Sequence, residues 1–397
     1  MMDGQDLPQA ADRRRNAVNR QLLPAEAYTS EAWFRREQAE LFAKVWQFAG
    51  LVEDLKAPGD YRAIDLAGAP YLLLRDENNQ LRAFHNICRH RGARLLDGSG
   101  NVGNAIVCFY HRWAYGLDGA LQGMPQAATE FPTLDKSCFG LIPVKLATWR
   151  NLIFINADPN AAPLEQWLAG GPDQIVPHQP ENLVEVADLM FRVRANWKIV
   201  VENFIDSYHL FYLHSVSLGD GDFFGLKQWP AGRHWLERRG LKQGKTHAKM
   251  MLPVIDGVPP TYGFHGCWVF PNLGLTALAT HWLTFHVMPQ SAELSFVQLR
   301  IRAAREALEA IGDHAPPPPE ALPDYVVHAK GPYTAIRLDP RRDVAPLESN
   351  NVTREDIYAC EAIQRGMHSP RWSVGALSSW EEALTFFQQQ VTDYVAL

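Results

Sequence analysis

The alternation of apolar and polar residues divides the chain into a strand-rich first part and a mixed second part. Residues 29–46 place apolar side chains near helical spacing, and Thr29 or Ser30 stands where a helix cap is needed. From about residue 50 the pattern changes to short apolar runs between turn residues. This predicts strands at 61–66, 70–75, 81–87, 104–109, 114–117, 120–123 and within 141–156. Asp118-Gly119 is a strong hairpin signal between two of these runs. We therefore expect an N-terminal helical segment (1–47) followed by a small all-β domain (48–160).

The second part follows a stretch rich in proline, glycine and alanine, 157–174, which we interpret as the join between domains. Its apolar pattern predicts strands and three helices. The strands are expected at 183–195, 275–280, 282–288 and 294–303, and the helices at 197–212, 354–368 and 380–396. Proline at 314–323 must interrupt regular structure, and we expect a loop from there to about residue 351. Residues 161–397 are expected to form a second domain, which makes the fold class α+β.

Composition narrows the class of protein further. The chain has 397 residues, 47% of them hydrophobic, and a formal net charge of -6 that gives no reason to expect nucleic-acid binding. No apolar run is long enough to span a bilayer, so we expect no membrane association. Five cysteines in so long a chain are too few for a disulfide framework. They are typical of the reducing cytoplasm, where we expect the protein to be soluble and its cysteines to bind metal or pack in the core.

Two cysteine–histidine pairs lie inside the β domain. Cys88 and His90 are separated by one residue, Cys108 and His111 by two, and seventeen residues lie between the pairs. Zinc accepts two sulfur and two nitrogen ligands, but its usual spacing groups cysteines with cysteines and histidines with histidines. Interleaved pairs suit a two-iron cluster with both cysteines on one iron and both histidines on the other. The alternatives are a structural zinc or four unrelated residues.

A second candidate site follows Asn196 in the predicted helix 197–212. His209 and His214 are five residues apart, so an ideal helix places them about 140° apart around its axis. Both reach one metal only if the helix ends or distorts, and we predict a break near residues 210–213. Asn203 and Asp206 precede His209 at spacings of three, on one helix face. Two histidines and one carboxylate form the facial triad of non-haem Fe(II) oxygenases.

The chain resembles the large subunits of Rieske non-haem iron oxygenases, the ring-hydroxylating dioxygenase family. CRHRG and CFYHRW match the Rieske [2Fe–2S] motif C-x-H … C-x-x-H, and Trp113 with the hairpin YGLDGALQG extends the match. ENFIDSYHLFYLH is similar to the mononuclear-iron motif, and the likeness covers nearly the whole chain. Family members commonly carry proline and glycine where this chain has Phe109 and Arg112. The resemblance implies a Rieske domain followed by a helix-grip (START-like) domain, an antiparallel sheet against a long C-terminal helix.

The resemblance also assigns roles to residues. It implies that Cys88, His90, Cys108 and His111 hold the cluster, and that His209 and His214 hold Fe(II) with Asp356 from the C-terminal region; Glu355 is the alternative if the register differs by one. Asp206 orients His209 and connects it to His111 of a neighbouring subunit, and Asn203 flanks the iron. Phe204 is the first candidate for the substrate pocket, and Phe211, Tyr212, Trp282 and Phe285 are weaker candidates.

The implied function is a terminal oxygenase that uses O2 and electrons from NAD(P)H. No G-x-G-x-x-G motif opens a dinucleotide-binding unit, so the electrons must come through a ferredoxin or flavin reductase on another chain. Hydroxylation of a small aromatic substrate is the first interpretation. The tail QRGMHSPRWSVGALSSWEEALTFF also resembles monooxygenases or demethylases of quaternary ammonium compounds, and the alternative of another class is a Rieske electron carrier. The resemblance implies a homotrimer, with or without a small β subunit.

Overall fold

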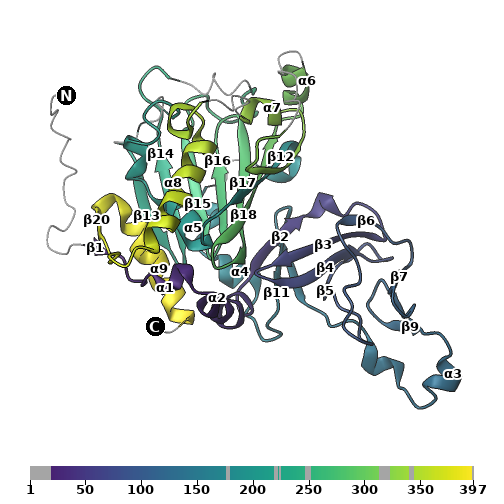
Figure 1. The fold of residues 1–397 in the computed structure, drawn as a ribbon. Coiled ribbons are helices and arrows are strands. Elements are labelled where there is room, and N and C mark those ends of the chain that lie inside the picture. Colours follow the sequence, from purple (N-terminus) through teal and green to yellow (C-terminus); the bar gives the residue numbers. More distant parts are fainter. Residues whose placement is uncertain are drawn as a thin grey trace.

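The computed structural model describes residues 19–175, 179–218, 222, 225–245, 252–312, 322–338 and 344–395. Figure 1 shows two parts side by side: a large sheet with helices on one face, and a smaller assembly of strands that projects from one end of it. The fold is α+β with antiparallel sheets, as predicted.

The projecting part contains three small antiparallel sheets. One has the order β10-β11-β2, the second β5-β4-β3-β6 and the third β7-β8-β9. Their bounds are β2 (Gln47–Leu51), β3 (Asp60–Leu66), β4 (Ala69–Arg75), β5 (Leu81–His85), β6 (Ser99–Asn101), β7 (Ala105–Val107), β8 (Ala114–Gly116), β9 (Leu121–Gly123), β10 (Lys145–Trp149) and β11 (Leu152–Asn156). The short helices η2 (Val52–Asp54), α3 (Ala127–Glu130) and η3 (Lys136–Phe139) lie in its loops. The predicted hairpin is present, and Gly119 takes the positive φ of 88° that its turn requires.

The large sheet has eight strands in the order β13-β14-β15-β16-β17-β18-β12-β19, and every neighbouring pair is antiparallel. Its strands are β12 (Val184–Val193), β13 (Lys227–Ala231), β14 (His234–Arg239), β15 (Phe264–Val269), β16 (Leu273–Ala277), β17 (His281–Ser291), β18 (Leu294–Ala303) and β19 (Val326–Lys330). The predicted loop before residue 351 is wrong in this respect, since it contains edge strand β19, α7 (Thr334–Arg337) and η8 (Pro346–Glu348). These elements are too short to show a period in the sequence. Most of the proline-rich stretch 314–323 lies outside the described residues.

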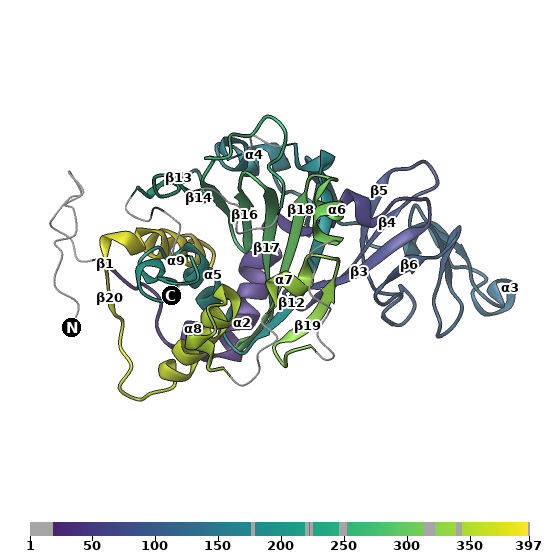
Figure 2. The same ribbon diagram turned by 90° about the horizontal axis from the view of Figure 1, so that it is seen from above.

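Three helices cover one face of the large sheet: α5 (Trp197–Ile205), α8 (Val352–Met367) and α9 (Glu382–Tyr394) (Figures 1 and 2). The N-terminal helices α1 (Glu26–Thr29), α2 (Glu31–Glu37) and the π-helical turn η1 (Gln38–Phe42) join this layer and pack into the same core. Ser30 caps α2 by accepting a hydrogen bond from the N–H of Trp33, as the sequence predicted. The remaining short elements are β1 (Asn19–Arg20), η4 (Pro172–Gln174), η5 (Pro180–Asn182), α6 (Ala307–Gly312), β20 (Ala376–Leu377) and η9 (Ser379–Glu381).

The opposite face of the sheet packs against the Rieske-motif part. Phe48 of β2, Phe154 of β11 and Leu168 of α4 (Leu164–Leu168) share one core with Leu275 and Trp282 of the large sheet. The stretch 157–174, predicted as a join, thus contributes the apolar residues of α4 to this shared core.

A cluster of charged residues ties the two parts together. Asp54 accepts two hydrogen bonds of 2.7 Å from Arg300 of β18 and one of 2.6 Å from Arg62 of β3. Burial raises the pKa of Asp54, but Arg300 and Arg62 outweigh it and bring the pKa to about 2. Arg302, the next outward position on β18, pairs with Glu53. These ion pairs, together with the shared apolar core, orient the small sheets relative to the large sheet.

Candidate active site

The two cysteine–histidine pairs meet at the tip of the projecting part. Cys88 and His90 follow β5, while Cys108 and His111 lie in the loop between β7 and β8. Both cysteines are buried and neither forms a disulfide. The two histidine rings lie 4.6 Å apart, centroid to centroid. The structure thus brings all four residues together.

Paired backbone hydrogen bonds shape both loops. The N–H of Cys88 donates to Ala93 O at 2.7 Å, and the N–H of Cys108 donates to Trp113 O at 2.9 Å. The two turns close through Gly92, with φ 73°, and Arg112, with φ 57°. This left-handed backbone explains why glycine is common at the position of Arg112 in the family; here an arginine adopts the same conformation.

The surroundings of this cluster were only partly predicted. His90 stacks on buried Trp113 with ring centroids 4.9 Å apart and planes 7° apart. The hydroxyl of Tyr115 lies 3.2 Å from Cys88 Sγ and accepts a hydrogen bond from the N–H of Arg89. The sequence analysis did not predict a role for Tyr115. Its position in the hairpin, four residues after His111, could have indicated that it lies near the cysteine–histidine pairs. A hydroxyl near a cluster sulfur adjusts the reduction potential.

These four side chains fit a two-iron cluster better than one zinc ion. A tetrahedral site would bring its ligand atoms within about 4 Å of one another, given Zn–S and Zn–N bonds of about 2.3 and 2.0 Å. Among the described residues, His209, His214 and Asp356 form a group of three whose ligand atoms lie that close, within 4.8 Å, and the Cys88 group does not. The wider spacing leaves room for two metal ions and their bridging atoms.

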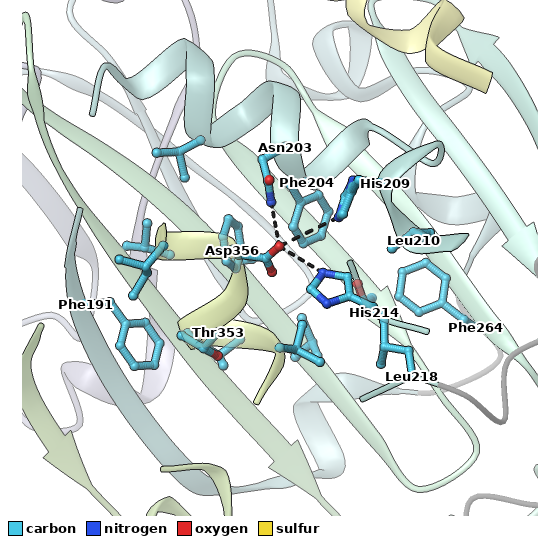
Figure 3. A pocket seen from close by; sticks show the side chains of 18 of the residues that line it. Phe191, Asn203, Phe204, His209, Leu210, His214, Leu218, Phe264, Thr353 and Asp356 are labelled. Carbon is cyan, nitrogen blue, oxygen red and sulfur yellow. Dashed lines mark hydrogen bonds and ion pairs between the residues drawn. The ribbon is translucent and has the colours of Figure 1, made fainter. Parts of the chain in front are cut away.

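The second site lies between α5 and α8, on the helical side of the large sheet. Oδ1 of Asp356 lies 2.9 Å from Nε2 of His214 and 3.7 Å from Nε2 of His209 (Figure 3). Asn203 donates a hydrogen bond of 2.9 Å to the same oxygen. Two imidazoles and one carboxylate converging on one point are the donor set of a facial-triad Fe(II) site.

The helix that carries the histidines ends earlier than predicted. Asn196 caps α5 through a hydrogen bond from the N–H of Lys198, and α5 stops at Ile205. The backbone of Asp206 is extended, with ψ 122°. Its carboxylate accepts a hydrogen bond of 2.6 Å from the N–H of Tyr208, and this local turn competes with continuation of the helix. The chain thus leaves the helix already at 206–208. The short helix η6 (His209–Phe211) follows and ends at Phe211, so the break predicted near 210–213 is also present. Asn203, Asp206 and His209 consequently do not share a continuous helix face.

Glu355 and Asp356 have separate places around His214. Oε2 of Glu355 lies 2.7 Å from Nδ1 of His214 and also accepts the hydroxyl of Ser217 at 2.7 Å. Nε2 therefore faces Asp356 and the metal position. Burial lowers the pKa of His214, but hydrogen bonds to Asp356 and Glu355 outweigh it and raise the pKa. Glu355, considered as an alternative ligand, instead lies where a carboxylate orients a ligand histidine.

Asp206 lies beside the other histidine. Its Oδ2 is 3.1 Å from Nδ1 of His209. The two atoms are close, but their relative orientation does not meet the geometry of a hydrogen bond. Nδ1 of His209 accordingly has no hydrogen-bond partner among the described residues. The side chain of Asp206 is 18% exposed.

A cavity of about 210 Å³ adjoins the three metal-site residues, with walls from the large sheet, α5 and α8. Phe204 and Phe285 stack in its wall at 4.6 Å, as candidate pocket residues. Tyr212 and Trp282 do not line it. Tyr212 is 62% exposed, and Trp282 is completely buried in the core on the other face of the sheet. The period of two along β17 explains the second difference, because His281, Leu283 and Phe285 face the cavity and Trp282 cannot.

The cavity also contains charged residues that sequence reasoning missed. Glu237 and Arg239 of β14 are both in its wall, and the guanidinium of Arg239 lies 4.1 Å from the ring centroid of Phe264. Burial raises the pKa of Glu237, an effect opposed by the charges of Arg239 and His209. Arg337 of α7 is a third charged residue of the wall. Nothing in the local sequence marked these residues, because only the pairing of β14 and the position of α7 bring them to the cavity.

Comparison with known proteins agrees with both sites. Residues 45–146 match the family described as Rieske [2Fe-2S] domain, and residues 180–397 match the family described as Ring hydroxylating alpha subunit (catalytic domain). The chain belongs to the Rieske non-haem iron oxygenases. Its cofactors are a Rieske [2Fe–2S] cluster and a mononuclear iron, as predicted, and a Rieske carrier without catalysis would lack the second domain.

Relatives within this family include enzymes of quaternary ammonium metabolism. Choline monooxygenase, chloroplastic, from Beta vulgaris is 30% identical over 89% of this chain and 72% of its own length. The carnitine monooxygenase oxygenase subunit of Escherichia coli (strain K12) is 30% identical over 72% of this chain and 76% of its own length. The chain is thus the oxygenase component of an oxidoreductase, and proteins of this family work with a reductase or ferredoxin.

Solved structures share the fold. A quaternary ammonium Rieske monooxygenase superposes with a TM-score of 0.75 at 24% identity, covering 95% of this chain and 96% of that one. Naphthalene 1,2-dioxygenase from Rhodococcus sp. gives 0.70 at 20% identity, with 94% of each chain covered. No helix among the described residues has the length and apolar character to cross a membrane.

Proposed function

We propose that this Rieske oxygenase is a monooxygenase that oxidises a small quaternary ammonium compound, with electrons from NAD(P)H delivered by a separate reductase. The choline and carnitine monooxygenases among its relatives support this substrate class. The proposal replaces hydroxylation of an aromatic ring, the first interpretation of the sequence, as the preferred reaction.

The observation that carries the proposal is a buried carboxylate among aromatic rings beside the metal site. Glu237 lines the cavity near His209, and Phe204, Phe264 and Phe285 line the same cavity. A quaternary ammonium group has no hydrogen to donate, so proteins bind it with aromatic faces and nearby negative charge. A carboxylate and phenyl rings next to the metal supply both at the place where an N-alkyl group has to react.

The remaining roles follow from the geometry. Cys88, His90, Cys108 and His111 would hold the cluster, and His209, His214 and Asp356 would hold Fe(II). When bound, the cluster supplies single electrons and the iron activates O2 beside the substrate. Glu355 orients His214, Asn203 positions the carboxylate of Asp356, and the apolar walls keep water from the reacting group.

Electron transfer between protomers is part of the proposal. The loops that carry Cys88 and Cys108 lie at the end of the projecting domain farthest from α5 and α8 (Figure 1). Within one chain the two metal sites are therefore far apart. We propose a ring of three copies in which His111 of one protomer approaches Asp206 of the next, as the resemblance implied. For the quaternary ammonium Rieske monooxygenase of similar fold, inter-subunit electron transfer is described.

Asp206→Asn tests this route. We expect both metal centres to be retained and single-turnover product to fall by about 10- to 100-fold, because an amide does not hold the hydrogen bond and charge that the carboxylate offers to histidines on two chains. The measurement follows cluster oxidation by absorbance and product by mass spectrometry. Asp393→Asn, an exposed aspartate of α9, is the matched control. Wild-type product yield in Asp206→Asn would show that this residue is not the bridge.

Aromatic hydroxylation remains a second candidate because the stacked rings of Phe204 and Phe285 make a flat apolar wall. A substrate panel with ¹⁸O2 and a surrogate reductase separates the two. We expect labelled product from choline, L-carnitine or γ-butyrobetaine and none from naphthalene or indole.

Glu237→Gln should lower kcat/KM for the ammonium substrate by about 10- to 100-fold, the usual effect of losing a charged contact in a buried site. Glu306→Gln, at an exposed position, is its control. Labelled product from the aromatic compounds alone would reverse the assignment.

A further inference from the structure

Arg337 is a cationic residue of the cavity wall that has no counter-charge in the described chain. It is the last residue of α7, and its Nε is buried without a hydrogen-bond partner among the described residues. Burial lowers the pKa of Arg337, and the hydroxyl of Tyr333 opposes this effect; no carboxylate of the described residues contributes. The guanidinium nevertheless stays protonated, because an arginine side chain does not lose its proton in proteins.

A charge in such a position calls for a partner. Removing an ion from water costs several kcal/mol unless an opposite charge and hydrogen bonds replace the solvent. The guanidinium presents a planar fork of N–H groups whose geometry matches a carboxylate. Since the described chain does not supply that carboxylate, a ligand in the cavity is the natural source.

The N-terminus of α8 lies next to Arg337 and presents backbone N–H groups to the cavity. Asn351 caps α8 by accepting the N–H of Arg354, and its amide donates a hydrogen bond of 3.0 Å to the carbonyl oxygen of Arg337. Val352 and Thr353, the first two residues of the helix, line the cavity, and Thr353 is seen below Asp356 in Figure 3. The first turn of a 16-residue helix attracts anions through its free N–H groups and its dipole.

The carboxylates of the cavity wall interact with described residues other than Arg337, which does not prevent Glu237 from also facing a bound cation. Glu237 interacts with Arg239, and its carboxylate receives hydrogen bonds from Gln228 and Ser207. Asp356 is shared between Asn203 and the two histidines. Arg337 is thus the charge of the wall that the described chain leaves to a ligand. It lies next to the start of α8, whereas Glu237 lies near His209.

We propose that Arg337 binds a carboxylate of the substrate, so that the enzyme prefers quaternary ammonium carboxylates to quaternary ammonium alcohols and amides. The inference rests on the proposed function for the cationic end of the substrate, which Glu237 and the phenylalanine rings receive near the metal. A zwitterion would place its carboxylate at Arg337 and the first turn of α8, and its N-alkyl groups toward His209 and Asp356. Arg337 then selects the substrate and takes no part in the oxidation.

Three ligands of the same shape distinguish the contribution of the carboxylate end of the substrate from that of its ammonium end. They are γ-butyrobetaine, its primary amide, which keeps only the cation, and 5,5-dimethylhexanoate, in which carbon replaces the nitrogen and only the carboxylate remains. Binding is measured by anaerobic titration calorimetry on the holoenzyme, for wild type, Arg337→Gln, Arg337→Lys and the surface control Arg305→Gln, whose side chain is exposed. The Rieske absorbance and the melting temperature of each variant report that it has folded.

The expected pattern is specific. Wild type binds γ-butyrobetaine about 10- to 100-fold more tightly than the amide, the range for a charged hydrogen bond. Arg337→Gln removes this preference and leaves the affinity for the amide within about two-fold, Arg337→Lys restores part of it, and Arg305→Gln changes nothing.

Equal binding of acid and amide by wild type would overturn the inference, and so would equal weakening of both by Arg337→Gln. If 5,5-dimethylhexanoate binds as tightly as γ-butyrobetaine, the proposed ammonium function fails, while the comparison of acid with amide still decides the role of Arg337. If wild type binds neither carboxylate at millimolar concentration, the carboxylate site is wrong.

Discussion

Asp356→Ala is expected to abolish product formation while it leaves the Rieske cluster intact. Removing one ligand of a three-residue facial site leaves two imidazoles, too few to retain Fe(II). Total iron should fall from about three to about two per chain, with an unchanged Rieske spectrum. The measurements are metal analysis, visible absorbance and turnover with a surrogate reductase.

The neighbouring residue provides a graded comparison. Glu355 contacts His214 on the side away from the metal, so Glu355→Gln should weaken iron binding or activity by about 10- to 100-fold without abolishing either. Glu348→Ala removes an exposed carboxylate just before α8 and should have no effect. If Asp356→Ala retained about three irons per chain, or if Glu355→Gln were the variant that lost the metal, the two carboxylates would have to exchange roles.

Lys198→Met is expected to cause the largest loss of stability of any single substitution considered. The Nζ of Lys198 donates a hydrogen bond of 2.6 Å to Glu37, and both side chains are 0% exposed. Glu37 also accepts the indole N–H of Trp197 at 2.8 Å. Removing the lysine leaves a buried carboxylate without a counter-charge, which costs about 3–5 kcal/mol. For a domain of this size that is a fall in melting temperature of about 6–20 °C.

The double variant Glu37→Leu/Lys198→Met tests the cause. Replacing both charges by apolar groups should recover most of the loss, because the penalty comes from the unpaired ion. Melting is followed by circular dichroism, with Rieske absorbance reporting separately on the other domain. A single variant as stable as wild type, or a double variant no better than the single, would show that the pair does not fasten the N-terminal segment to α5. The consequence for function is direct, since α5 begins at this pair and leads to Asn203 and His209.

Much of the site was predictable because most of its metal-binding residues lie close together in the sequence, at characteristic spacings. The cysteine–histidine pairs sit on tight loops, where a spacing of one or two residues already restricts the geometry. The break predicted between the two histidines is present, but the sequence did not show that α5 itself ends before His209. The ability of Asp206 to accept the N–H of Tyr208 decides where α5 ends, and a 3.6-residue period does not carry that information.

The pocket shows the opposite case. Phe204 and Phe285 were predicted to line it and do, whereas Trp282 was assigned to the wrong face of β17 and Tyr212 is at the surface. A strand with apolar residues on both faces gives no sign of which face holds the ligand. Of the three remaining cysteines, expected to pack as small hydrophobic residues, Cys267 and Cys360 are buried and Cys138 is exposed. Cys138 is exposed because it lies in η3, a short 3-10 helix at the surface with no buried residue.

The sequence by itself determined the two metal-binding motifs, the α+β class and the division into a Rieske part and a catalytic part, because these depend on contacts between residues close in the chain or on the apolar period of long elements. Only the tertiary structure decided which of Glu355 and Asp356 lies close to both histidines, and which charged residues line the cavity. Glu237, Arg337 and His209 come from three separate elements, and their proximity depends on how strands pair and helices pack. Long-range packing of this kind brings together residues that no local pattern connects.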